Sequence, residues 1–172
     1  MAELSHKERL QPSLLDRLTD DEPKQRVEAR EKRVLSVSQL RECVRRDLAW
    51  LFNTTNLTAV DPELEPAYPL AARSVINYGI PDLAGRTVSG IDIAALERLL
   101  RQAIWDFEPR LVRGSVTVRG LVDEDMSHNA VAFAIDAELW AQPVPLRLYL
   151  RTQVDLEAGR VDVSEAGERR GS

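Results

Sequence analysis

Residues 91–120 read IDIAALERLLRQAIWDFEPRLVRGSVTVRG and change from one periodicity to another in the middle. In the first half the apolar residues recur at steps of three and four, which predicts an amphipathic helix capped by Asp92. In the second half Val116 and Val118 alternate with polar residues, which predicts a half-buried strand. The buried stripe of the predicted helix consists of Leu96, Leu100, Ala103 and Phe107, widened by Leu99 and Ile104.

The tripeptide Glu108-Pro109-Arg110 lies at the corner between this helix and this strand. Pro109 should end the helix, because proline lacks an amide hydrogen and pushes the preceding residue out of the helical region. Glu108 then lies at the negative end of the helix dipole and needs a compensating charge. Arg110 can brace the turn as an ion pair, although residues two apart on an extended chain point to opposite faces. The alternatives are that the charges face a partner, or that Glu108 is half of a catalytic acid pair.

A second long helix is predicted upstream of this stretch, from Ser36 to about Asn53. Ser36 and Gln39 have the spacing of a capping box. The buried stripe of this helix should consist of Val37, Leu40, Val44, Leu48 and Leu51. Its opposite face carries Arg41, Arg45 and Arg46, which form either a solvated basic face or a site for an acidic partner.

The 40 residues between the two helices are irregular, with prolines and glycines at many positions. A short helix is expected over residues 68–77. The central segment SVINYGIPDLAG, residues 74–85, is unusually apolar for a loop. Its large side chains must be covered by the domain or by a partner; they are Val75, Ile76, Tyr78, Ile80 and Leu83.

Downstream of the corner, alternation continues in the segments that contain residues 131–139 and 146–151, and a last short strand is predicted at residues 161–163. The connections are short, so the strands should form an antiparallel meander with one apolar face. Two helices on one face of this sheet give an α+β domain over residues 36–164. The polar tail, residues 165–172, is expected to be disordered.

Residues 1–35 form an arm that is dense in charge yet neutral, with eight acidic and eight basic residues. Within the arm, Leu14, Leu15 and Leu18 would lie on one face of a short helix that Ser13 caps. Two turns do not hold a helix in water by themselves. This face therefore either folds back on the core of the domain or docks on another subunit.

Composition limits the classes of function. The 172 residues carry a net charge of −5, which argues against a nucleic-acid-binding surface. No apolar run is long enough to span a bilayer and no signal peptide is evident, so we expect a cytoplasmic protein without membrane insertion. Cys43 is the only cysteine, which excludes an internal disulfide. His6 and His128 are the only histidines and are far apart in the sequence, so we expect no metal site and no cofactor.

Five segments occur in a characteristic order: LQPSLLDRL at 10–18, RDLAWLFNTTN at 46–56, SVINYGIPDLAG at 74–85, FEPRL at 107–111 and PVPLRLYLRTQVDL at 143–156. In this order they resemble the GPW/gene 25-like family, and within it the TssE-type baseplate subunits of type VI secretion systems. The resemblance extends over about residues 10–163. Each segment alone is weak, but the shared order makes the match specific.

The resemblance implies a structural role in a contractile injection system, in the bacterial cytoplasm at the inner face of the cell envelope. Members of this family are wedge components that bind other wedge subunits, here TssF and TssG with TssK as a further candidate. The signature Glu-Pro-Arg motif maps onto Glu108, Pro109 and Arg110 and implies contact with the wedge core. Members also start polymerisation of the sheath, here TssB/TssC, which joins by strand exchange. The strands that contain Leu146, Leu148, Leu150, Val161 and Val163 are therefore expected to face the sheath.

Two other classes of function compete with this interpretation. The family carries an older label of lysozyme, and Glu108 with Asp106 or Asp82 would be the acid pair. Glycoside hydrolysis needs two carboxyl groups roughly 5 to 9.5 Å apart, and the neighbouring Arg110 would oppose protonation of Glu108. The third class is a stand-alone adaptor that binds an acidic peptide on the three arginines of the first helix. We expect no enzymatic activity.

Overall fold

Four antiparallel strands and two long helices dominate the computed structural model, which describes residues 14–18, 36–85, 87, 90–121, 129–140 and 145–166. The strands are β1 (Thr117–Leu121), β2 (Ala130–Leu139), β3 (Leu146–Asp155) and β4 (Arg160–Glu165), and they pair in the order β1-β2-β3-β4. The predicted antiparallel meander is confirmed.

The sheet runs further toward the C-terminus than the sequence pattern predicts. Strand β4 extends to Glu165, and the amide of Ala166 donates a hydrogen bond to the Tyr149 carbonyl at 3.0 Å. The first two residues of the tail predicted over 165–172 are therefore ordered against the sheet. Residues 167–172 lie outside the described part of the chain.

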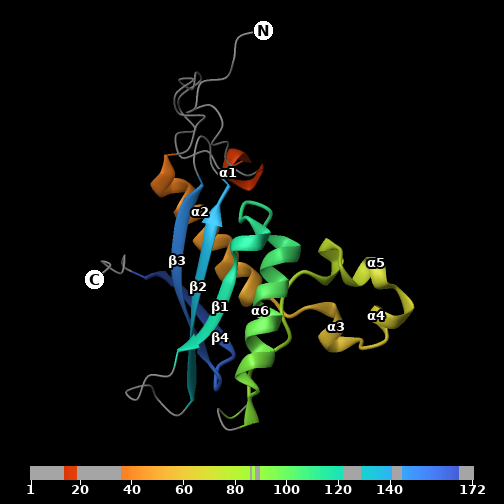
Figure 1. Cartoon of the computed structure of the whole chain (residues 1–172). Coiled ribbons are helices and arrows are strands. Elements are labelled where there is room, and N and C mark those ends of the chain that lie inside the picture. The colour runs from red at the N-terminus through yellow and green to blue at the C-terminus, as the bar shows by residue number, and fades with distance from the viewer. Residues whose placement is uncertain are drawn as a thin grey trace.

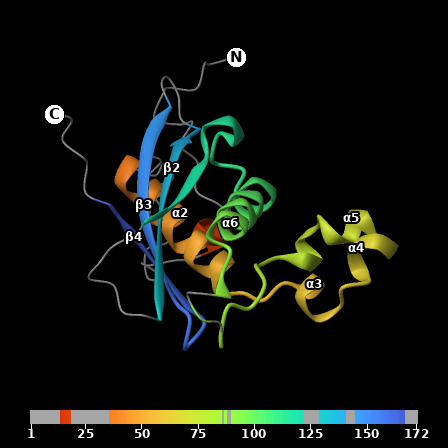
Figure 2. The ribbon, with the colours of Figure 1, turned by 60° about the horizontal axis from the view of Figure 1, so that its bottom comes forward.

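Both long helices lie on the same face of the sheet (Figures 1 and 2). Helix α2 (Val37–Phe52) covers the β4 side, and helix α6 (Ile93–Phe107) covers the β1 side. This is the predicted α+β arrangement. Inward-facing side chains of the strands and helices form one core, with its largest fully buried members at Phe133, Leu48, Leu51, Leu100, Ile104, Ile135, Leu139, Leu148, Leu150 and Leu156.

Helix α2 begins at the predicted capping box. The Gln39 amide donates to Ser36 Oγ at 3.2 Å, and the Ser36 amide donates to Gln39 Oε1 at 2.9 Å. The predicted stripe is buried except at Val37, which is 38% exposed. The prediction is wrong at this position because the first turn of α2 lies beside Glu165 at the end of β4, beyond the core. Phe52 completes the stripe instead.

Helix α6 begins at the predicted cap, where Asp92 Oδ1 accepts a hydrogen bond from the Ala95 amide at 3.0 Å. Most of its predicted stripe is buried, but Leu99 and Phe107 are only partly buried. The ring of Phe107 instead lies edge-on to Tyr78, with 5.3 Å between the ring centroids. The helix ends at Phe107, as Pro109 predicts.

The segment between the two long helices forms a lobe that projects beside α6 (Figure 2). It contains α3 (Leu57–Val60), α4 (Leu64–Ala67), α5 (Pro69–Ala72) and the 3-10 helix η3 (Val75–Asn77). The helix predicted over residues 68–77 is thus two short pieces. The buried Asn77 side chain joins them to α3 through the Thr58 amide and the Ala72 carbonyl, each at 2.8 Å.

The apolar segment at residues 74–85 divides between core and surface. Ile80 and Leu83 are buried in the core, and Tyr78 is partly buried. Val75 and Ile76 are 81% and 67% exposed, so the domain does not cover them.

Helix side chains occupy backbone groups at both outer edges of the sheet. At the β4 edge, Asn53 donates to the Val161 carbonyl at 2.7 Å and accepts from the Val161 amide at 2.9 Å, while Arg45 donates to the Val163 carbonyl at 2.8 Å. At the β1 edge, Glu97 accepts from the Gly120 amide at 2.6 Å. These contacts satisfy groups that would otherwise be a template for another strand.

Gly79 fixes the return of the lobe to the core. Its φ of +122° is one that other residues rarely adopt, and an added Cβ would lie 2.2 Å from the Thr54 carbonyl oxygen. The next residue, Ile80, donates to that same oxygen at 2.9 Å. The close approach therefore requires glycine.

We predict that Gly79→Ala lowers the free energy of unfolding by more than about 2 kcal/mol, since it adds both backbone strain and a clash with main-chain atoms. Urea unfolding followed by circular dichroism measures the change. Gly114→Ala is the control, because a Cβ at that position meets nothing within 4 Å. Equal stability of the two variants would contradict the prediction.

Candidate functional site

The Glu108-Pro109-Arg110 corner is held between the end of α6 and the end of β2. The Glu108 amide donates to the Ile104 carbonyl at 2.9 Å and closes the helix. After the turn, the Trp140 amide donates to the Arg110 carbonyl at 2.7 Å, and the Val112 amide donates to the Glu138 carbonyl at 2.8 Å. The corner is therefore fixed by backbone contacts on both sides.

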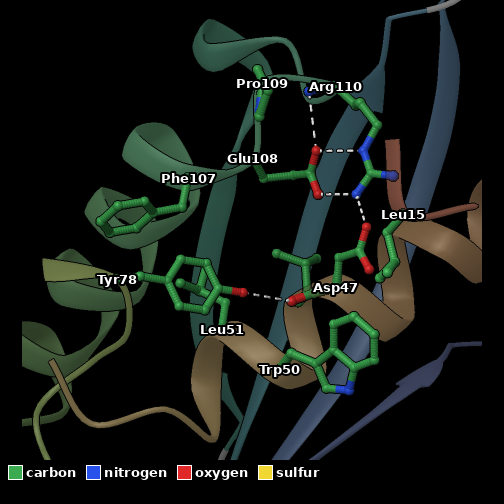
Figure 3. A pocket seen from close by; sticks show the side chains of 10 residues that line it. Leu15, Asp47, Trp50, Leu51, Tyr78, Phe107, Glu108, Pro109 and Arg110 are labelled. Carbon is green, nitrogen blue, oxygen red and sulfur yellow. Dashed lines mark hydrogen bonds and ion pairs between the residues drawn. The ribbon is translucent and has the colours of Figure 1, made fainter. Parts of the chain in front are cut away.

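Glu108 and Arg110 pair with each other (Figure 3). Glu108 is 5% exposed, and its Oε1 and Oε2 accept from Arg110 Nε and Nη2 at 2.7 and 2.5 Å. Its Oε1 also accepts from the Arg110 amide at 3.1 Å. A turn at Pro109 brings the two side chains together, so the alternation of an extended chain does not apply. The sequence left three interpretations of Glu108 and Arg110: an ion pair that braces the turn, charges that face a partner, and half of a catalytic acid pair. The observed geometry is that of the ion pair.

Asp47 on α2 is the third member of this cluster and was not predicted from the sequence. Its Oδ2 lies 2.5 Å from Arg110 Nη2, and its Oδ1 lies 2.7 Å from Arg46 Nη2. Asp47 precedes Arg110 by 63 residues, so no spacing rule joins them. The sequence did contain one signal for this residue: Asp47 is a carboxylate on α2 next to Leu48 and Leu51, which belong to the buried stripe of that helix.

The paired carboxylates set the electrostatics of the corner. Burial opposes the charged form of Arg110, but hydrogen bonds and charges from Glu108 and then Asp47 outweigh it and raise the pKa of Arg110. Burial, followed by the charges of Asp47 and Glu108, raises the pKa of Tyr78. Both groups therefore keep their ordinary protonation state at neutral pH.

A groove of about 490 Å³ opens beside this cluster (Figure 3). We call it the corner groove; it is lined by Leu15, Asp47, Leu48, Trp50, Leu51, Tyr78, Phe107, Glu108, Pro109 and Arg110. Trp50 is 50% exposed and Pro109 is exposed at the rim. Most of the lining is apolar, with the paired charges on one side. Such a groove suits an apolar side chain of a partner.

The predicted short helix is present as α1 (Leu14–Leu18). Its predicted cap, Ser13, lies outside the described residues. Leu15 faces the corner groove, whereas Leu14 and Leu18 are each 73% exposed. Leu15 is itself 44% exposed, whereas the Asp16 side chain is 8% exposed and pairs with Arg46 at 2.8 Å. The helix therefore folds back on the domain through Asp16 and part of Leu15, and leaves Leu14 and Leu18 uncovered.

The arginines of α2 do not form the predicted open basic face. Arg41 Nη2 donates to the Arg147 carbonyl at 3.1 Å, Arg45 binds β4 and pairs with Glu42, and Arg46 pairs with Asp47. These contacts commit part of each arginine to the domain itself, which counts against the adaptor hypothesis, although Arg45 and Arg46 keep 30% and 31% of their side-chain exposure. The reason is that β3 and β4 lie close enough to accept from Arg41 and Arg45, while Asp16 and Asp47 pair with Arg46.

The residues assigned to the sheath-facing strands lie mainly in the core. Leu148, Leu150, Val161 and Val163 are buried under the helices, and Leu146 is partly buried. Their side chains belong to the core or pack against it, on the side of the sheet that the helices cover. The strands can therefore meet another protein only through their backbone edges or their opposite face.

The carboxylates proposed for catalysis are occupied or apart from the groove. Arg110 binds both oxygens of Glu108. Asp106 Oδ1 lies 2.9 Å from Gln102 Nε2, and Asp82 accepts from the Ala84 amide at 2.9 Å; neither lines the corner groove. Among the described residues there is no cluster of three metal-binding side chains, and no helix is long and apolar enough to cross a membrane.

Comparison with known proteins identifies the family. A family model described as baseplate wedge protein gp25 matches residues 38–144, which is more than half of the chain. No curated protein and no solved structure matches the chain. The matched part contains nearly all of α2, the lobe, α6, the corner and strands β1 and β2. The chain belongs to the family of baseplate wedge protein gp25, and its role is that of a structural baseplate component.

Proposed function

We propose that this protein is a TssE-type wedge subunit of a type VI secretion baseplate, without catalytic activity, which binds the wedge subunits TssF and TssG and starts the TssB/TssC sheath. The baseplate family supports the structural role. The observation that carries the wedge contact is the corner groove, in which an exposed Trp50 and Pro109 adjoin a charged cluster. The protein would act in the bacterial cytoplasm, in the baseplate at the inner face of the envelope.

The geometry divides the roles of the motif residues. Glu108 is buried and bound by Arg110, so it acts as a positioning residue for the arginine. Arg110 retains 22% of its side-chain exposure and lines the groove, as does Pro109. A side chain that is already fixed by two carboxylates loses little conformational entropy on binding. The wedge partner would therefore contact Arg110, Pro109 and Trp50. Glu108 would not contact the partner and would hold Arg110 in position from within the domain.

We predict that Trp50→Ala and Arg110→Ala each weaken binding to the purified TssF–TssG complex about tenfold or more, as expected for aromatic and arginine contacts at the centre of an interface. Biolayer interferometry measures the affinity. Arg160→Ala is the matched control for the arginine, since Arg160 is exposed on β4, away from the groove. Unchanged affinity in folded Trp50 and Arg110 variants would exclude the corner groove as the wedge site.

Glu108→Gln tests the division of roles. It removes the charge from a buried carboxylate that holds an arginine, so we predict a loss of about 2 to 4 kcal/mol in the free energy of unfolding. Trp50→Ala should cost less than about 1 kcal/mol, because half of this side chain is exposed. Chemical denaturation of both variants makes the comparison. A Glu108→Gln protein as stable as the wild type would mean that Glu108 does not brace the corner.

The edge of β4 is our proposed point of sheath contact. It is the outer strand at the C-terminal end of the sheet, and its apolar side chains are buried, so another strand could pair with it only along its outer backbone edge. The groups at Val161 and Val163 that another strand would use are bonded to Asn53 and Arg45. A sheath strand must therefore replace these side chains before it pairs.

We predict that Asn53→Ala shortens the lag of TssB/TssC polymerisation on assembled baseplates, because it exposes the Val161 amide and carbonyl. Light scattering or electron microscopy of sheath length over time measures the lag. Glu97→Ala is the matched control, since it opens the β1 edge instead. A shorter lag only with Glu97→Ala would place the sheath at β1, and no change with either variant would exclude strand addition at these edges.

A further inference from the structure

The outer face of α6 carries a tryptophan with arginines around it. Arg98, Arg101 and Trp105 recur at steps of three and four and therefore lie on one side of the helix. The guanidinium groups of Arg101 and of Arg113, in the 3-10 helix η5 (Arg113–Ser115), lie over the Trp105 ring at 5.5 and 5.1 Å from its centroid. We call these four residues the α6 patch.

The α6 patch has an excess of positive charge. Arg98 lies 4.0 Å from Asp92, and Arg113 lies 3.7 Å from Asp106, with the two arginine side chains 62% and 64% exposed. Such long, exposed ion pairs contribute little. Arg101 forms no ion pair among the described residues. A carboxylate from another molecule would therefore meet a guanidinium that the domain itself leaves uncompensated.

The indole of Trp105 lacks a hydrogen-bond acceptor. Its Nε1 is buried and forms no hydrogen bond within the described part of the chain. Buried polar groups in folded proteins almost always have a partner. A carboxylate that enters the patch beside Arg101 would supply one, once the side chains that cover this atom shift. The unpaired guanidinium and the unpaired indole thus both favour an acidic occupant.

The lobe has the opposite charge. Residues 57–77 contain three acidic residues, Asp61, Glu63 and Glu65, and one basic residue, Arg73, for a net charge of −2. All four are exposed, and none of them forms an ion pair with another described residue. Within one copy the arginines of the α6 patch therefore do not pair with the lobe. The two surfaces are complementary in charge, and each is left for another molecule.

The lobe also exposes apolar side chains, since it projects from the rest of the domain (Figure 2). Its short helices contact one another, and within residues 57–77, all of which the structure describes, Leu64 is the one large apolar side chain that is buried. So many uncovered apolar side chains on a small unit are typical of an interaction site. Those between 66% and 87% exposed are Val60, Tyr68, Leu70, Val75 and Ile76.

We propose that the lobe of one copy of this chain binds the α6 patch of a second copy. The lobe carboxylates reach Arg101 and the Trp105 indole, and the side chains of Tyr68 and Leu70 pack on the apolar stems of the arginines. The two surfaces differ, so the contact is heterologous, and a pair of copies keeps one free lobe and one free patch for further association. The contact uses neither the corner groove nor the edge of β4, and it does not rest on the proposed wedge and sheath functions.

Sedimentation velocity of the full chain tests whether copies associate. We expect the weight-average sedimentation coefficient to rise as the protein concentration increases from about 5 to about 500 µM in about 50 mM NaCl, and to rise less in about 300 mM NaCl, because the contact depends on charge. A coefficient that stays at the value of the monomer over this range would overturn the proposal.

Charge reversal tests which surfaces meet. Arg101→Glu and the double variant Glu63→Arg/Glu65→Arg should each remain monomeric, since like charges then face each other. An equimolar mixture of the two should associate again, because the lobe of the first variant and the α6 patch of the second are unchanged. If two lobes or two patches paired instead, one of the variants would still associate by itself. That result, or a mixture without recovery, would overturn the proposal.

Two further variants control for net charge and for apolar contact. Arg160→Glu makes the same charge change at a residue that is 73% exposed on β4 and should associate as the wild type does; a loss there would trace the effect to net charge and overturn the proposal. Tyr68→Ala/Leu70→Ala changes no charge and should weaken association about tenfold, as expected when apolar contacts at an interface are lost. Unchanged association of this folded variant would exclude the lobe as the binding surface.

Discussion

The ion pairs of Arg110 with Glu108 and Asp47 are the interaction on which the site depends, because they join the end of α6 to the middle of α2. Burying charges is costly, and replacement of a buried ion pair by apolar residues is often neutral or stabilising. Arg110 Nη1 is also buried without a hydrogen-bond partner among the described residues. The cluster is therefore better explained by the position it gives Arg110 and the adjoining groove than by net stability.

Helix α2 serves both ends of the proposed assembly. Its Arg46 and Asp47 hold the corner, while Arg45 and the capping residue Asn53 occupy the edge of β4. Free edges invite unwanted strand addition, and covered edges prevent it. The corner and the edge of β4, which we propose as the wedge and sheath contacts, are thus both held by α2, so one helix fixes their relative orientation.

The elements of the fold were predictable from local patterns, whereas the contacts of the site were not. Period and capping residues located both long helices at Ser36 and Asp92, and alternation located the four strands. Asp47 was not predicted because its pairing with Arg110 depends on how α2 packs against the corner. A local sequence pattern carries no information about that packing. The prediction of a basic face on α2 did not hold for the same reason. The side chains of Arg41 and Arg45 are long enough to reach carbonyl groups of the neighbouring strands. The motif at residues 108–110 indicated where the charged corner lies, but the sequence did not show whether Glu108 and Arg110 pair with each other or face a partner.

Burial of Glu108 changes how the Glu-Pro-Arg motif has to be interpreted. A clamp presents both charges to the partner, and loss of either would remove a direct contact. Here the carboxylate is beneath the surface and both its oxygens bind Arg110, so its loss acts through the orientation of the arginine and the turn at Pro109. The same pairing argues against the glycosidase alternative, because an acid that donates a proton to a sugar must reach the groove and Glu108 is directed at a guanidinium. Proline, glutamate and arginine are then three parts of one rigid corner, with the glutamate as its internal support.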